Sequence, residues 1–202
     1  MVYRKSAGTA ARKEARRKTI LEAATRLFGG HGYHATTVPM IVAAADSSTG
    51  SFYAHFRSKE DVFAAVLEAL GQSIGALLEQ TKVTEPNPLL RILCAVESLF
   101  LYLAQNPEVA RILIVESSGL SPALEQVRRG ILHEHAEHVR QTLESAPELF
   151  GVENPAIAAR CLVGAVFEAL TSWQEENPDS RMSAIEVARA VGNYNVRAIQ
   201  KR

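Results

Sequence analysis

The chain has 202 residues, of which 47% are hydrophobic and 22% charged, and its formal net charge is zero. This length and balance are typical of a globular protein with one large or two small domains, and they exclude a disordered chain. The charge is divided unevenly, because residues 1–60 carry ten Lys and Arg against four Asp and Glu, whereas residues 61–202 carry twelve against eighteen. This division of charge has two interpretations: a single basic face that binds nucleic acid, or a random scatter of solvated charges. We favour the first, because the positive charges are concentrated in the first part of the chain and the rest is acidic.

Targeting and redox signals are sparse. No apolar run is expected to reach the roughly 18 residues of a membrane span, and residues 1–18 lack the apolar segment of a signal peptide. We therefore expect a cytoplasmic protein with no membrane partner. Cys94 and Cys161 lie far apart in apolar surroundings without CxxC spacing, so we expect buried free thiols rather than a disulfide or a metal site.

Helical periodicity fills nearly all of the chain and no alternating strand pattern is convincing, which predicts an all-α fold. Asn-Pro pairs precede three of the apolar periodic runs, and each pair supplies an N-cap followed by a proline whose missing N–H is not needed in a first helical turn. Residues 1–10 are expected to be disordered, and Asn177-Pro178 is expected to stop a helix. The predicted helices lie at residues 10–29, 37–45, 48–55, 58–81, 88–105, 107–117, 122–145, 155–176 and 183–200.

The most informative segment is residues 37–56, TVPMIVAAADSSTGSFYAHF. It predicts two short helices around a tight turn, the second of which begins with small hydroxyl residues and then presents a tyrosine and a histidine. This is the plan of a helix-turn-helix, which places the end of one helix in the DNA major groove. A basic amphipathic helix precedes the segment and another helix follows it.

The surrounding motifs have a family spacing. RKTILEAATRLF, GYHATTV, STGSFYAHF and SKED follow one another in an order that resembles the N-terminal domain of the TetR family of bacterial transcriptional regulators. The resemblance covers about residues 12–75; the rest is similar to the family's C-terminal domain in length, order and pattern. It implies a helix-turn-helix DNA-binding domain at residues 10–60, a linking helix at 58–81, and a helical effector-binding and dimerisation domain at 82–202.

The residues expected to contact DNA lie on the basic helix, at both helix starts of the motif and at the start of the linking helix. Small residues let the backbone approach bases or phosphates, and free N–H groups at a helix start attract phosphate. The expected set is Arg16, Thr37, Ser48, Thr49, Gly50, Ser51, Tyr53, His55 and Lys59. Where the family usually has Gly-Val in the turn, this chain has Asp46-Ser47. Asp tolerates a left-handed turn, whereas Ser47 loses packing and needs a hydrogen-bond partner.

Self-association is predicted from residues 155–176. Apolar side chains there cover roughly 200° of the helical wheel, about twice the width that an amphipathic surface helix needs. The excess indicates burial against a second copy, although a well-buried monomer core is the alternative. By resemblance, this helix and the one at 183–200 pair with their symmetry mates. The expected interface residues are Leu162, Val166, Leu170, Trp173 and Val191.

An effector site is predicted from helix 88–105. Glu97 falls on an apolar arc, where a carboxylate is either paired with an arginine or available to a ligand, and Glu116 raises the same question. The expected lining is Leu93, Glu97, Phe100 and Glu116. His133, His135 and His138 are expected to be surface residues, because only the last two share a helix face. We expect neither a metal nor a cofactor.

Together these features predict a transcriptional repressor. A homodimer would bind a palindromic DNA operator and be released by a small-molecule effector of unknown identity. A ligand-independent DNA-binding regulator or an architectural protein is the alternative. An enzyme is not expected, because the sequence offers neither an evident nucleophile–base pair nor a metal cluster.

Overall fold

The computed structural model describes residues 3–177 and 179–201, with side chains from residue 10 onward. Over these residues the fold is all-α, as predicted, and the only β feature is an isolated bridge between Phe150 and Gln200. The first helix begins at Tyr3, so the expected disorder of residues 3–10 was wrong; Pro178 lies outside the described residues. The helices are α1 (Tyr3–His31), α2 (Val38–Ala44), α3 (Thr49–Tyr53), α4 (Lys59–Thr84), α5 (Pro88–Gln105), α6 (Pro107–Arg111), the π-helical turn η1 (Ile112–Glu116), α7 (Pro122–Glu144), α8 (Pro155–Glu175) and α9 (Ala184–Ile199).

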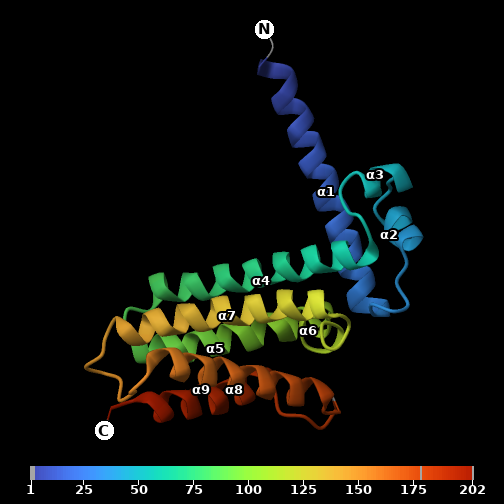
Figure 1. Cartoon of the computed structure of the whole chain (residues 1–202). Helices are drawn as coiled ribbons and strands as arrows, with labels where there is room; N and C mark the ends of the chain where they lie inside the picture. Colours follow the sequence, from blue (N-terminus) through green and yellow to red (C-terminus); the bar gives the residue numbers. More distant parts are fainter. Residues whose placement is uncertain (1–2, 178, 202) are drawn as a thin grey trace.

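The helices form a small head on a larger body (Figure 1). Helices α2 and α3 lie beside α1, which extends away from the body, and α4 runs from the head along one side of the body. The body also contains α5, α7, α8 and α9, which lie roughly along the same direction as α4. Most boundaries follow from the caps expected in the sequence: the side chains of Ser58, Ser121 and Asn154 each accept a backbone N–H, and Ser183 forms a capping box with Glu186. Asn106 differs, because its amide donates instead to the Tyr102 carbonyl at 2.7 Å.

The head has an aromatic core that continues into the body. Phe28 and Phe63, both fully buried, meet edge to face with 4.8 Å between ring centroids. The same cluster of buried residues includes Ile112 of η1 and Leu124 of α7. Head and body therefore share packed side chains as well as the α4 backbone.

The turn between α2 and α3 contains the two departures from the family pattern. Asp46 has φ 45°, the left-handed conformation that was predicted for it. The Ser47 hydroxyl is buried and has no hydrogen-bond partner, which is the cost that the sequence indicated. Ser47 therefore reduces the stability of the head.

Replacing Ser47 with Val is expected to raise the free energy of unfolding by about 1 kcal/mol, because it removes a buried unsatisfied hydroxyl. In thermal denaturation this corresponds to an increase in Tm of about 2–4 °C. Ser47→Thr is the matched control, since threonine has nearly the shape of valine but keeps the hydroxyl. Equal stabilisation by Thr and Val would show that packing volume, not the unpaired hydroxyl, limits stability here.

Two expectations about composition need correction. Three helices, α4, α5 and α8, are long and apolar enough to cross a membrane by length and composition, contrary to the prediction from the sequence. In the structure α4 packs on α5, whereas α8 packs on α7 and α9, and all three contribute apolar walls of a cavity. Of the cysteines, which were both expected to be buried, Cys161 is exposed and Cys94 is half-buried; both are free thiols.

Candidate functional site: a DNA-reading head and a cavity in the body

The first residues of α3 are exposed to solvent, while the rest of this short helix is anchored to the head. Ser48 caps the helix by accepting the Ser51 N–H at 3.1 Å, and this leaves Thr49 and Gly50 exposed. Phe52 points the opposite way and is fully buried, which anchors the five-residue helix to the head. Tyr53 keeps 55% of its surface exposed. Three of the predicted contact residues, Thr49, Gly50 and Tyr53, are therefore accessible from solvent.

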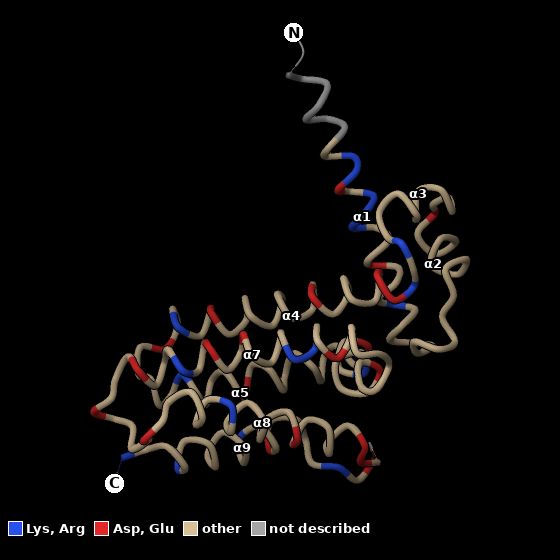
Figure 2. Tube along the Cα trace, in the orientation of Figure 1, with Lys and Arg blue, Asp and Glu red and all other residues tan. Residues whose placement is uncertain are grey.

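The basic part of α1 lies beside α3. The guanidinium of Arg16 donates to the Asp46 carbonyl at 3.1 Å, and that of Arg17 lies 5.4 Å from the centre of the Phe56 ring. Burial lowers the pKa of His55, and the positive charges of Lys13, Arg17 and Arg16 lower it further, against Glu14. Figure 2 shows Lys and Arg, in blue, gathered on the part of α1 that extends from the body. The positive charge therefore comes from α1 and lies close to α3, which has no Lys or Arg of its own.

Two predicted DNA contacts also have structural roles. The Thr37 side chain caps α2 by accepting the Met40 N–H at 3.4 Å. The Lys59 ammonium donates to the Tyr33 carbonyl at 2.9 Å and lies 4.3 Å from the centre of the Tyr33 ring. Lys59 thus holds the α1–α2 loop against α4, and any phosphate contact it makes would come in addition to this role.

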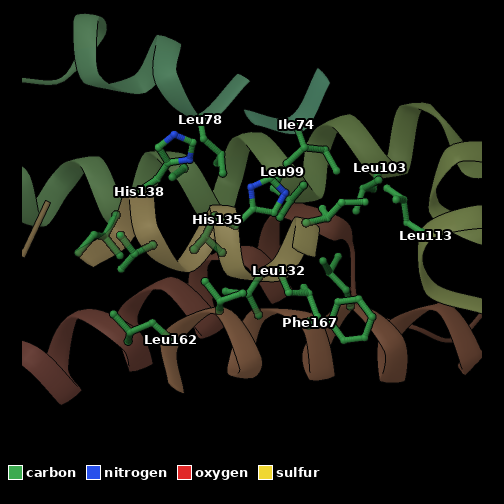
Figure 3. A pocket seen from close by; sticks show the side chains of 18 of the residues that line it. Ile74, Leu78, Leu99, Leu103, Leu113, Leu132, His135, His138, Leu162 and Phe167 are labelled. Atoms are coloured by element: carbon green, nitrogen blue, oxygen red, sulfur yellow. The ribbon is translucent and has the colours of Figure 1, made fainter. Parts of the chain in front are cut away.

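The body contains a cavity of about 160 Å³. Its walls come mainly from α4, α5, α7 and α8 and consist largely of aliphatic side chains, such as Ile74, Leu99 and Leu132 (Figure 3). Leu113 of η1 lies toward one end of this cavity and His138 toward the other. A concave, mostly apolar site with few polar groups is the common form of a small-molecule site.

The prediction of which face of α5 lines the effector site was wrong. Ile92, Val96 and Leu99 face the cavity, whereas Leu93, Glu97 and Phe100 do not line it. Leu93 packs on Gly192 of α9, Phe100 contacts Trp173, and Glu97 pairs with Arg189 at 3.3 Å. Glu97 therefore takes the ion-pair alternative that the sequence left open.

Glu116, the fourth predicted effector residue, lies at the junction of head and body. Its carboxylate accepts the Tyr33 N–H at 2.7 Å and pairs with Arg111 at 3.1 Å. The Arg111 guanidinium also donates to the Gly30 carbonyl at 3.2 Å. Glu116 does not line the cavity, but its helical turn η1 does, through Leu113 and Ile114.

Three of the five residues predicted for the dimer interface are buried within the single chain, and the other two are half-buried. Leu162, Leu170 and Trp173 are no more than 5% exposed. Val166 lines the cavity and Val191 packs in the body core. The wide apolar face of α8 is thus explained by the cavity and core of the same chain, and these five residues are not a free surface.

Sequence reasoning missed two histidines of the cavity. His135 and His138 were expected on the surface, yet both line the cavity, together with Asn195 of α9. The signal was present in the sequence, because the two histidines share the face of α7 that carries Ile131 and Leu132. A correct phase for α7 would have placed them inside.

Comparison with known proteins assigns the class. Residues 20–66 match the family described as "Bacterial regulatory proteins, tetR family". The chain is 29% identical over 157 residues to the uncharacterized HTH-type transcriptional regulator YdgC of Bacillus subtilis, covering 74% of this chain and 76% of YdgC. It is 28% identical over 138 residues to the HTH-type transcriptional regulator AcrR of Shigella flexneri, covering 65% and 64% of the two chains.

Solved structures agree over nearly the whole length. The SmeT–triclosan complex has a TM-score of 0.78 at 25% identity and covers 93% of this chain and 92% of that chain; SmeT is the repressor of a Stenotrophomonas maltophilia multidrug efflux pump. FadR from Bacillus subtilis in complex with stearoyl-CoA has a TM-score of 0.77 at 22% identity, covers 89% and 97%, and supports the fold alone. Residues 20–66 thus match the DNA-binding domain of the TetR family, and over most of its length the chain is similar to bacterial transcriptional regulators of that family. It is a DNA-binding regulator and not an enzyme, as the sequence predicted.

Proposed function

We propose that this protein is a cytoplasmic repressor that binds a palindromic operator as a homodimer and is released by a small molecule bound in the body cavity. The observation that carries the proposal is the combination of an exposed recognition helix with a largely apolar cavity that reaches η1. The binding of triclosan by SmeT supports a small-molecule effector. We also propose the domain division predicted from the sequence: a DNA-binding domain at residues 10–60, with its linking helix at 58–81, and an effector-binding and dimerisation domain at 82–202.

The dimer surface that we propose is the outer face of α8 and α9. Ile157 and Tyr194 are 52% and 66% exposed on these helices, and Cys161 and Gly164 are exposed between them in sequence. Small residues on such a face allow a symmetry-related helix to approach closely. We propose this face in place of the interface residues predicted from the sequence, which are buried or half-buried in the single chain.

For DNA contact we propose the full set predicted from the sequence, from Arg16 to Lys59. The exposed residues at the start of α3 would meet base edges, and the side chains of α1, together with Tyr53 and His55, would meet phosphates. Two recognition helices related by two-fold symmetry would read an inverted repeat.

The proposal is tested by selecting bound duplexes from a random DNA pool. The expected result is an inverted repeat whose half-sites lie about one helical turn, or a multiple of it, apart. An enriched sequence without symmetry would contradict the homodimer. Binding without sequence preference would instead favour the architectural alternative.

Operator affinity is expected to rise several-fold as the pH falls from about 8 to about 6, because His55 takes up a proton on binding. Burial and nearby cations lower the pKa of His55 in the free protein, so that the ring is neutral at pH 7. A DNA phosphate beside it favours the imidazolium and raises the pKa, so lower pH favours the complex. Fluorescence anisotropy titrations at several pH values would measure the slope of operator affinity against pH.

The slope should flatten in His55→Ala and persist in His34→Ala, the matched control, which removes an exposed histidine outside α3. An equal slope in wild-type protein and His55→Ala would show that His55 does not meet a phosphate.

In this proposal, η1 would transmit ligand binding in the cavity to the DNA-binding head and so cause release of DNA. Leu113 and Ile114 contact the cavity, while Glu116, on the same turn, holds the end of α1. A ligand that fits only one position of η1 would shift the equilibrium between two head positions by its difference in affinity for them.

A further inference from the structure

The cations around the cavity already have partners. Lys82 pairs with Glu79 at 2.6 Å, and Arg128 pairs with Glu125 at 2.8 Å. The Arg91 guanidinium donates to two backbone carbonyls, at 3.0 and 3.1 Å. Among the described residues that line the cavity there is no Asp or Glu. The cavity thus offers neither an uncompensated cation to an anionic ligand nor a carboxylate to a cationic one.

The hydroxyl groups that line the cavity already donate hydrogen bonds to backbone carbonyls. Thr81 donates to the Leu78 carbonyl, Ser117 to that of Leu113 and Thr142 to that of His138, at 2.6, 2.7 and 3.2 Å respectively. Donation from the cavity wall to a ligand must therefore come from another group.

Three described side chains of the lining have buried polar atoms without a hydrogen-bond partner: Nδ1 of His138, Oδ1 of Asn195 and both ring nitrogens of His135. The other nitrogen of His138 lies 3.1 Å from the Glu79 carboxylate, and the Asn195 amide donates to the Leu162 carbonyl at 3.4 Å, so of these three only His135 has no partner at all.

The His135 ring points into the middle of the cavity (Figure 3). Burial lowers the pKa of His135 and the nearby His138 lowers it further, while Glu134 acts in the opposite direction. A neutral imidazole has one N–H donor and one nitrogen acceptor, and leaving both unpaired in an apolar site is costly.

We propose that the cavity selects small uncharged molecules that are mostly apolar and carry one hydroxyl, and that His135 recognises this hydroxyl. This rests on the proposed function only in taking the cavity as the effector site. A hydroxyl can donate to one imidazole nitrogen or accept from the other, so either tautomer of His135 gains a partner. The volume of about 160 Å³ is close to that of an apolar cavity of about 150 Å³ that holds benzene, so a single substituted ring fits.

The test compares four probes that each carry one aromatic ring: p-cresol, toluene, 4-methylbenzoate and benzyltrimethylammonium. Calorimetric titration of the full-length protein should show p-cresol binding about fivefold to tenfold tighter than toluene, the ratio expected for one hydrogen bond. The two ions should bind more weakly than p-cresol. A tighter 4-methylbenzoate or benzyltrimethylammonium complex would overturn the proposal.

His135→Leu should bring the ratio of the p-cresol and toluene affinities close to one while leaving toluene binding unchanged or tighter. His133→Leu is the matched control, because it makes the same substitution at an exposed position of the same helix, and it should keep the wild-type ratio. His135→Gln, which retains a donor and an acceptor, should keep part of the preference and provides a second variant if His135→Leu folds poorly. A preference that survives in His135→Leu, or is absent from the wild type, would refute the role of His135.

DNA release is measured separately, by anisotropy of a selected operator in the presence of each probe. Preferential binding of p-cresol through His135 without release of DNA would refute the proposed repressor mechanism and leave the selectivity of the cavity intact. Release by toluene and p-cresol at the same occupancy, with no difference in affinity, would support the mechanism and refute the selectivity.

Discussion

Gly164→Glu is expected to convert a dimer of twice 22.0 kDa into a monomer and to lower operator affinity by orders of magnitude. In the single chain Gly164 is exposed and a Cβ there would meet nothing within 4 Å, so a side chain can extend from it into solvent. Glutamate is also favoured over glycine in a helix interior by about 0.5–1 kcal/mol. Any loss of association is therefore a property of the interface and not of a damaged fold.

In the proposed dimer the same position faces a second copy. The two-fold axis places two added carboxylates in one interface, where each occupies space needed for close helix packing and loses its hydration. A monomer then holds a single recognition helix, which reads one half-site. Light scattering after size-exclusion chromatography would give the mass, and anisotropy titrations would give the affinity.

Gly130→Glu is the matched control. Gly130 is also an exposed helical glycine at which an added Cβ would meet nothing within 4 Å, but it lies on α7, outside the proposed interface. The substitution should leave mass and affinity unchanged. A dimeric Gly164→Glu protein with wild-type affinity would show that the outer face of α8 is not the interface.

The helices could be predicted from sequence because their boundaries depend on local chemistry. Asn87, Asn154 and Ser183 each cap the helix that follows them, and these interactions span only a few residues. The left-handed Asp46 and the unpaired Ser47 hydroxyl were predictable for the same reason, since a tight turn fixes its own backbone and one adjacent side chain.

The faces of the body helices could not be predicted in this way. An apolar arc on a helical wheel shows that one face of the helix is buried. It does not show whether that face contacts a neighbouring helix, a cavity or a second copy of the chain. On α5, Glu97 lies beside apolar neighbours and is nonetheless held at the edge by Arg189, which is distant in sequence. On α8, the width of the apolar face was interpreted as a partner surface, although a cavity on one side and the core on the other account for it.

Glu116→Ala is expected to loosen the head from the body and to lower the free energy of unfolding by about 2–3 kcal/mol, or Tm by about 5–10 °C. Only 12% of the Glu116 side chain is exposed, and its removal leaves the Tyr33 N–H without its acceptor and the Arg111 guanidinium with the Gly30 carbonyl alone. The contact is close, since a Cβ on Gly29 would come within 2.5 Å of the Cβ of Glu108 in α6. Hydrogen exchange should show the Tyr33 amide losing protection.

A loosened head should also weaken operator binding several-fold, because the two recognition helices of the proposed dimer are then less well held at the spacing of the half-sites. Glu116→Gln keeps a carbonyl acceptor for the Tyr33 N–H and should retain more stability than Glu116→Ala. Glu134→Ala, which removes an exposed carboxylate from α7, should leave Tm, exchange and affinity unchanged. If Glu116→Ala behaved like this control, the packed aromatic core and the α4 backbone alone would join head to body, and η1 would have no part in transmitting the state of the cavity to DNA.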